Sequence, residues 1–416
     1  MDHKDKFFPI NTKTACQLKW AWSTIYLNTG ITRSCHRTGE SLITSENFMD
    51  FHNTPKKIQE RNKMLKGEWP DDSCQYCKKI EDAGGISDRL RMSHVPNLSP
   101  PELEKNPTLT KVQPTLVEVY LSNACQMSCL YCSPSLSSSI ESENRKHGDF
   151  KKMGVDLKNS KGNFKDLLPS FWTWFRAGFQ KIKRLHVLGG EPFYQKEFEK
   201  MLDMIEQYPN PDCELNVVTN LMVSEEKLKY FVDRFYFLCK SRAIKRVDIT
   251  CSIDCWGQEQ EYVRHGISLA HWKKNFNYLM NNRWLVLNIN QTISVLTIKT
   301  MPNLLQKLNS WRQTRPIGHF FSGVDPGPNY LKAEIVGENF FKVDAEEILE
   351  LMPNNDEQNT AAKEYMTGIL NHVNNSKRNK EQLDNLIIFL DEKDRRRGTS
   401  WKTIFPWLAE LINFKP

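Results

Sequence analysis

Long apolar runs are missing from this sequence of 416 residues, and none approaches the roughly 20 residues that a membrane-spanning helix needs. The amino terminus carries charges of both signs and lacks the apolar stretch and cleavage site of a signal peptide. No block of one charge sign stands out either, because 57 basic and 50 acidic residues leave a net charge of only +7. These absences predict a cytoplasmic protein without membrane contact and favour nucleic acid only weakly as a partner.

The number of cysteines is odd, because the chain has eleven of them, so they cannot all pair in disulfides. In a chain without an export signal, an odd number argues against a disulfide framework and for metal binding or catalysis. The composition, with 39% hydrophobic and 26% charged residues, is typical of a soluble globular protein. The length allows one large domain with appendages or two to three ordinary domains.

Three parts follow one another along the chain. Residues 1–100 carry four cysteines and end in a proline-rich linker at 96–101. Residues 112–330 alternate β-branched runs with amphipathic stretches, which indicates strand-helix units around a parallel sheet or barrel. Residues 331–416 have a helical pattern. The expected strands lie at 116–121, 184–188, 215–218, 247–253, 286–293 and 319–324.

Two further stretches have open interpretations. The polar segment 133–162 shows no clear period and is either a lid or binding loop or a disordered insertion. The basic run Lys393 to Arg397, near Trp401, either contacts phosphates or an acidic peptide, or is a solvated helix end.

The central feature is a set of three thiols, Cys125, Cys129 and Cys132, spaced CxxxCxxC directly after the first strand of the repeating part. One loop can therefore wrap one metal centre. Thiolates select iron-sulfur clusters, zinc or copper(I), and a four-iron cluster given three thiolates keeps one iron open. That iron can chelate S-adenosylmethionine and pass an electron to its sulfonium, releasing a 5′-deoxyadenosyl radical. A structural zinc site is the alternative, although the loop offers no fourth ligand.

This spacing, with the aromatic Tyr131 before the third cysteine, resembles the radical S-adenosylmethionine (radical SAM) superfamily over roughly residues 112–325. The resemblance implies a partial (β/α)6 TIM-type barrel, an α/β fold with its site at the carboxyl ends of the strands. It also implies that Cys125, Cys129 and Cys132 hold a catalytic [4Fe-4S] cluster and that Tyr131 lies at the cofactor.

The same resemblance continues after the next strands. Gly189, Gly190, Glu191 and Pro192 look like the family's GGEP element, whose backbone receives the methionine amino group; two glycines allow close backbone approach. An ordinary strand-to-helix turn is the alternative.

Two further strand ends carry matching elements. Thr219 and Asn220 are similar to a Thr-Asn element, with Leu221 where a glycine often follows. Ser252, Asp254 and Arg264 resemble a Ser-x-Asp pattern with a downstream arginine, groups that bind the ribose or the methionine carboxylate. Arg264 is alternatively a surface residue. Asn290 and Thr292, on the fifth strand, are expected to share the polar face.

Four amino-terminal cysteines form a second candidate ligand set. Cys16 and Cys35, with Gly30 between them, and the CxxC pair Cys74 and Cys77 resemble the first part of a SPASM or twitch module. The resemblance implies an auxiliary [4Fe-4S] cluster, although this module follows the barrel in most relatives and precedes it here. A four-cysteine zinc site is the alternative. The remaining thiols, Cys213, Cys239, Cys251 and Cys255, are expected to be buried apolar groups.

Together these features predict a radical SAM enzyme with a cysteine-rich amino-terminal module and a carboxyl-terminal helical extension. Its auxiliary module favours a peptide or protein side chain as the substrate, and an external reductant such as flavodoxin or ferredoxin is expected as partner. RNA or nucleotide modification is the alternative activity, motivated by the net charge and the arginines. A zinc-binding interaction protein using the same cysteines is the alternative of another class.

Overall fold

The computed structural model divides into two compact units. The first comprises Met1–Asn123, Lys161–Val218 and Lys229–Asp248, and the second comprises Ala124–Ser160, Thr219–Leu228 and Ile249–Pro416. Among the described helices, none is long and apolar enough to cross a membrane. Pro96 of the predicted linker at 96–101 lies outside the described residues, as do Ser160 and Lys161 of the polar segment 133–162. Those residues are 8–36, 38–70, 74–82, 84, 87–92, 97–159, 162, 164–325 and 327–413.

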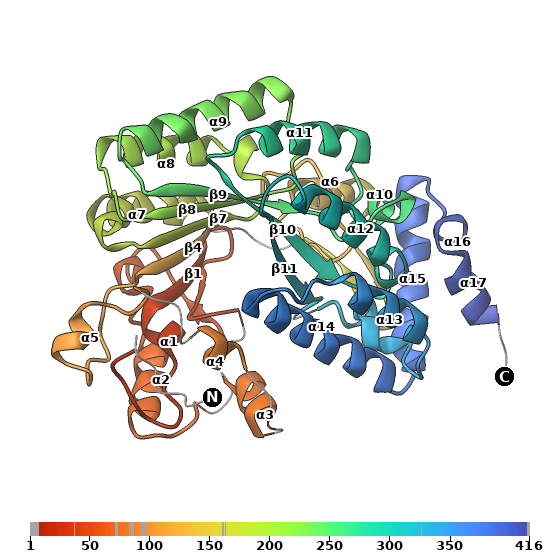
Figure 1. Ribbon diagram of the computed structural model, residues 1–416, viewed down its shortest axis with the longest axis horizontal. Helices are drawn as coiled ribbons and strands as arrows, with labels where there is room; N and C mark the ends of the chain where they lie inside the picture. The colour runs from red at the N-terminus through yellow and green to blue at the C-terminus, as the bar shows by residue number, and fades with distance from the viewer. Residues whose placement is uncertain are drawn as a thin grey trace. The chain divides into compact units, whose positions relative to one another are not determined.

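The strands of the first unit form a mixed sheet (Figure 1). Antiparallel pairs join β1 to β2 and β2 to β3, and parallel pairs then join β1, β4, β7 and β8 in that order. The strands of the predicted amino-terminal module therefore continue the sheet of the predicted core. Their bounds are Trp22–Tyr26 (β1), Ile31–Arg33 (β2), Ser41–Leu42 (β3), Leu116–Tyr120 (β4), Arg184–Leu188 (β7) and Glu214–Thr219 (β8).

Helices cover one face of this sheet because its strands alternate apolar and polar residues. Helix α7 (Phe164–Gly178) contributes buried Phe171 and Trp174. Phe198 of α8 (Lys196–Gln207) packs on Phe231 of α9 (Glu225–Lys240), and Figure 1 shows both helices running along β7 and β8. The short helices before β4 are α1 (Gln17–Ala21), α2 (Pro55–Leu65), α3 (Gln75–Asp82), α4 (Asp88–Met92) and α5 (Glu102–Lys105). All of them except α3 contribute to a separate apolar cluster around Trp20.

In the second unit, strand β10 (Val286–Ile293) pairs in parallel with β11 (Gly318–Gly323). Strand β9 (Arg246–Ser252) ends in this unit and is the strand next to β10. A hairpin of β5 (Phe150–Lys152) and β6 (Val155–Leu157) follows the helix α6. The helices are α6 (Ser138–His147), α10 (Gln258–Val263), α11 (Leu269–Asn281), α12 (Met301–Arg312), α13 (Lys342–Leu351), α14 (Glu357–Asn375), α15 (Lys380–Arg397), α16 (Trp401–Ile404) and α17 (Pro406–Asn413).

The predicted α/β class is confirmed, because each of the six expected strands occurs within one residue of its predicted ends and helices separate them. The helical pattern after residue 331 is confirmed as α13 to α17. The expectation of an irregular segment at 133–162 is wrong over α6, β5 and β6. One of its serines begins a short helix, because the Ser137 side chain accepts a hydrogen bond from Ile140 N–H as the N-cap of α6.

Candidate functional site

The loop that carries Cys125, Cys129 and Cys132 is fixed by its backbone. Ser128 N–H donates to the carbonyl of His265 (2.9 Å), and Leu130 N–H donates to that of Val263 (2.9 Å). Cys132 N–H closes a turn onto the Cys129 carbonyl at 3.1 Å. The second and third thiols therefore lie on a stretch of chain anchored to the end of α10.

Serines at the start of α6 hold the other end of the loop. Ser139 Oγ donates to the Cys125 carbonyl (2.8 Å), and Cys125 N–H donates to Ser138 Oγ (3.1 Å). Ser137 Oγ donates to the Met127 carbonyl at 2.6 Å. Sequence reasoning did not assign these serines a role, although their run directly after the third cysteine was the available signal.

Basic residues at the end of α15 complete the support of the loop. Arg397 donates from Nη2 to the Ser128 carbonyl (2.9 Å) and from Nε to Glu143 on α6 (2.8 Å). Lys393 also contacts Glu143, and Arg396 donates to Asn144 Oδ1 (2.8 Å). Both interpretations of the basic run are therefore wrong for Lys393, Arg396 and Arg397, whose side chains are almost fully buried.

We expect Arg397→Gln to loosen the cysteine loop, because it removes a charged hydrogen-bond donor to Ser128 and leaves Glu143 with fewer partners. A loss of about 1–3 kcal/mol of stability is typical for such a buried donor. Amide hydrogen exchange of peptides covering residues 125–132 should become faster. Arg395→Gln is the control, since Arg395 is exposed and pairs only with Glu392 among the described residues; equal exchange in both variants would contradict this role.

The three cysteines of this loop are half-buried residues and form no disulfides. Burial is the main cause that raises the pKa of Cys129 and of Cys132, the latter to about 12, and the Arg264 charge acts in the opposite direction on both. The Cys125 Sγ accepts a weak hydrogen bond from Asn220 Nδ2 at 3.7 Å. Within the described part of the chain, no group of three or more His, Cys, Asp or Glu side chains is already arranged to hold a metal ion. The donor set nonetheless fits a cluster with one open iron, because it offers three soft ligands and nearby positive charge.

Asp254, Arg264 and Tyr131 bind one another. The Arg264 Nε and Nη2 atoms donate to the two Asp254 carboxylate oxygens (2.8 and 2.9 Å), and Tyr131 OH donates to Asp254 Oδ2 (2.6 Å). Thr292 N–H adds a further hydrogen bond to Asp254 Oδ1 at 2.9 Å. Asp254 is fully buried and Arg264 is 6% exposed. Arg264 is therefore no surface residue, and this ion pair links the cysteine loop to the ends of β9 and β10.

Thr219, the last residue of β8, and Asn220 begin a tight turn. Leu221 has φ +62°, a left-handed conformation that favours glycine. Its N–H donates to Thr219 Oγ1 (2.9 Å), and Asn275 Nδ2 donates to its carbonyl (2.9 Å). The Asn220 Oδ1 accepts from Gln126 Nε2 (3.1 Å), which connects this turn to the cysteine loop. The buried Leu221 side chain thus keeps a glycine-like backbone.

The remaining predicted positions of the second unit lie at strand ends. Ser252 is the last residue of β9 and is 7% exposed. Asn290 and Thr292 are half-buried and alternate with buried neighbours on β10, so they share one face as expected.

The Gly189 to Pro192 segment belongs to the first unit. Gly189 and Gly190 have φ +77° and +57°, and Gln195 Nε2 donates to the Gly189 carbonyl at 2.6 Å. Glu191 is fully buried and accepts from Phe193 N–H, so its side chain caps the next turn. The backbone of the segment is thereby fixed in a conformation that only glycine adopts readily.

Gly189→Ala is expected to destabilise the protein by about 2–4 kcal/mol, from left-handed backbone strain together with overpacking. An added Cβ would lie 2.5 Å from Tyr120 Cδ1, and that ring is stacked on Tyr26. Chemical unfolding should be compared with Gly148→Ala, where φ is +79° and the added Cβ meets no atom within 4 Å. A similar loss in both variants would show that contact with Tyr120 is unimportant.

The four amino-terminal cysteines all lie in the first unit, on three separate segments. Cys16 precedes α1, Cys35 follows β2, and Cys74 and Cys77 lie at the start of α3. Burial and then the charges of the other three thiols raise the pKa of Cys16 above its ordinary range, and burial raises that of Cys74 to about 12. Within the described residues, however, no three of these thiols are grouped in an arrangement that could hold a metal ion.

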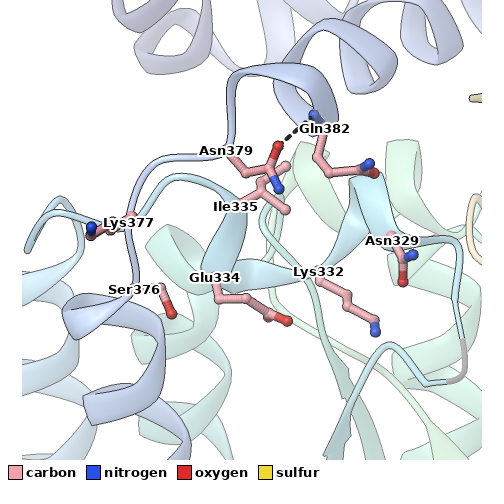
Figure 2. A pocket seen from close by; sticks show the side chains of 8 residues that line it. All are labelled: Asn329, Lys332, Glu334, Ile335, Ser376, Lys377, Asn379 and Gln382. Carbon is pink, nitrogen blue, oxygen red and sulfur yellow. Dashed lines mark hydrogen bonds between the residues drawn. The ribbon is translucent and has the colours of Figure 1, made fainter. Parts of the chain in front are cut away.

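One surface cavity of about 420 Å³ lies in the second unit, near the start of α15 (Figure 2). Lys332 and Glu334 line it, and the Asn379 side chain accepts from the Gln382 backbone N–H at 3.1 Å as the N-cap of α15. None of the predicted site residues contributes to it.

No family model and no curated protein matches the chain. Several solved structures are similar at low identity. SuiB of Streptococcus suis bound to S-adenosylmethionine is 14% identical with a TM-score of 0.37, covering 78% of this chain and 65% of that one. SuiB bound to its precursor peptide SuiA is 12% identical (TM-score 0.38, 83% and 70% covered), and anSMEcpe with bound AdoMet and a Cp18Cys peptide is 13% identical (TM-score 0.34, 69% and 66% covered). The chain thus spans about two thirds of the length of these structures, and its activity has to be argued from its own residues.

Proposed function

We propose that the protein is a radical SAM enzyme whose catalytic [4Fe-4S] cluster is held by Cys125, Cys129 and Cys132. The observation that carries this proposal is the loop itself. Its three thiols follow CxxxCxxC spacing, and hydrogen bonds from α6, α10 and α15 fix it on three sides. A site that keeps one iron open needs this kind of support, because no fourth protein ligand restrains it.

When bound, the cluster and S-adenosylmethionine supply a 5′-deoxyadenosyl radical that takes a hydrogen atom from the substrate. In the proposal, the backbone of Gly189 to Pro192 and the polar groups of Thr219, Asn220 and Ser252 bind the cofactor. Asp254, Arg264 and Tyr131 then act as positioning residues, because their polar atoms already bind one another. Their task is to keep the cysteine loop in place relative to β9 and β10.

We further propose that Cys16, Cys35, Cys74 and Cys77 bind an auxiliary [4Fe-4S] cluster. Four thiolates complete the ligand set of such a cluster, so its role is electron transfer or substrate positioning rather than direct chemistry. A structural zinc ion suits the same four thiolates. Metal analysis separates the two.

A peptide or protein side chain is the proposed substrate class. The alternative, RNA modification, was motivated by the basic residues at the end of α15. The side chains of Lys393, Arg396 and Arg397 already bind other groups of the protein. The proposal therefore keeps a peptide substrate and an external reductant such as flavodoxin or ferredoxin.

Anaerobic reconstitution with iron and sulfide tests the proposal. We expect a brown protein with about eight irons per chain that cleaves S-adenosylmethionine to 5′-deoxyadenosine when dithionite is added. About four irons with intact cleavage would remove the auxiliary cluster only. Zinc without acid-labile sulfide would instead favour a zinc-binding interaction protein and overturn the proposal.

A further inference from the structure

The sheet of the first unit has a polar face that the proposed cluster sites do not use. Register places Thr24, Glu118, His186 and Asn216 in one row across β1, β4, β7 and β8. Their strand neighbours, including Val117, are buried, all but Ser23 are apolar, and they point to the opposite face. The sheet thus presents a row of polar groups opposite its apolar core.

Glu118 lies in the middle of this row and is 2% exposed. Its Oε2 lies 3.4 Å from His36 Nε2, whereas its Oε1 has no hydrogen-bond partner among the described residues. The Trp22 Nε1 and Thr24 Oγ1 atoms beside it also lack partners in the described chain. Since an unsatisfied buried polar atom costs free energy, three of them together point to a missing ligand.

Other buried carboxylates of the protein show what Glu118 lacks. Glu60 pairs with Lys19, Asp254 with Arg264, and Glu392 with Arg396. Within the described residues, Glu118 makes no ion pair with a lysine or an arginine. Burial raises its pKa, whereas the neighbouring His36 and a hydrogen bond with the Tyr120 side chain act in the opposite direction. The charged form of a buried carboxyl group is stabilised when a cation binds next to it.

The contact with His36 places the buried Glu118 next to an exposed side chain. The His36 side chain is 49% exposed, and His186 and Asn216 on the next two strands are only half-buried. Aromatic rings line the same place, since Trp22 packs edge-on against His36 (4.7 Å) and Tyr26 stacks on Tyr120 (4.2 Å). Aromatic faces also attract organic cations.

We propose that this face binds an organic cation, the ammonium or guanidinium group of a lysine or arginine side chain, with Glu118 Oε1 as its acceptor. Trp22 Nε1 is a donor and Thr24 Oγ1 can donate, so both suit the carbonyl groups of a peptide that carries the cation. The proposed function enters only in naming a peptide substrate as the source, because cation binding itself needs no cluster.

Calorimetry on the full-length protein without added iron or S-adenosylmethionine tests this site. The probes are the Nα-acetyl amides of lysine and arginine, and their uncharged matches are those of norleucine and citrulline. We expect binding of the charged amides only, weakened at least about tenfold in Glu118→Gln, since one partner of a buried charge pair is lost. Glu214→Gln is the matched control, because Glu214 lies at the edge of the same face and already pairs with Arg184 and Arg246.

Thermal melting shows that each variant is folded, and His36→Gln adds a second arm that retains the Glu118 carboxylate. That variant should bind the charged amides at least as well as the wild type, because it removes the competing partner of Oε2. Absence of binding in the wild type, equal binding in Glu118→Gln, or binding of Zn²⁺ in place of the amides would each overturn the proposal. Failure of cluster reconstitution would leave these results unaffected, so the two proposals fail separately.

Discussion

Replacing Cys129 by alanine is expected to abolish S-adenosylmethionine cleavage and to lower the iron content from about eight to about four per chain. No other side chain of the loop can replace one of these thiols as a ligand, because the loop has no fourth cysteine. The hydrogen bonds that fix the loop hold its backbone and would not hold the cluster. Cys125→Ala and Cys132→Ala should have the same effect. Iron and acid-labile sulfide assays, with 5′-deoxyadenosine measured by chromatography, provide the test.

Cys239→Ala is the matched control for this series. Cys239 lies on α9 in a partly exposed position, so the expectation that it is buried is wrong, whereas Cys213, Cys251 and Cys255 are buried as expected. Burial of the thiol is still the main cause that raises its pKa to about 11. We expect it to keep the full iron content and activity. Retention of eight irons in Cys129→Ala would exclude this loop as the ligand set.

The second large effect is expected for Arg264→Gln, which should destabilise the protein by about 3–5 kcal/mol, the usual result of removing one partner of a buried ion pair. Asp254 would keep hydrogen bonds from Tyr131 and Thr292 but lose its only positively charged partner among the described residues. Because Tyr131 belongs to the cysteine loop, cluster uptake should also fall. Urea unfolding of the protein without iron measures the first effect, and iron content measures the second.

Arg145→Gln removes an equivalent arginine-carboxylate pair from an exposed position on α6, where Arg145 contacts Glu141. Exposed pairs contribute about 0–1 kcal/mol, so this variant should unfold like the wild type. If Arg264→Gln lost no more than Arg145→Gln, the link between Asp254 and the loop would be unimportant for folding.

The sequence alone predicted the features that local patterns encode. Short β-branched runs between amphipathic stretches predicted the six strands, and the spacing of Cys125, Cys129 and Cys132 predicted one loop with three candidate ligands. Both depend on residues a few positions apart, and that is the distance over which backbone geometry dictates which side chains share a face or a turn.

Only the tertiary structure decided how side chains distant in sequence are used. The sequence pattern of the basic run at the end of α15 indicates a solvated patch. In the structure, however, Arg397 donates a hydrogen bond to the carbonyl of Ser128, 269 positions away. The downstream position of Arg264 predicts a ligand contact, and only the structure shows that it also pairs with Asp254. The sequence pattern indicates only that Glu118 belongs to a buried strand. The register of that strand with its neighbours places Glu118 between Thr24 and His186 in a polar row. Such pairings follow from packing, because a buried charge takes whichever partner the fold brings near it, and spacing along the chain does not contain that information.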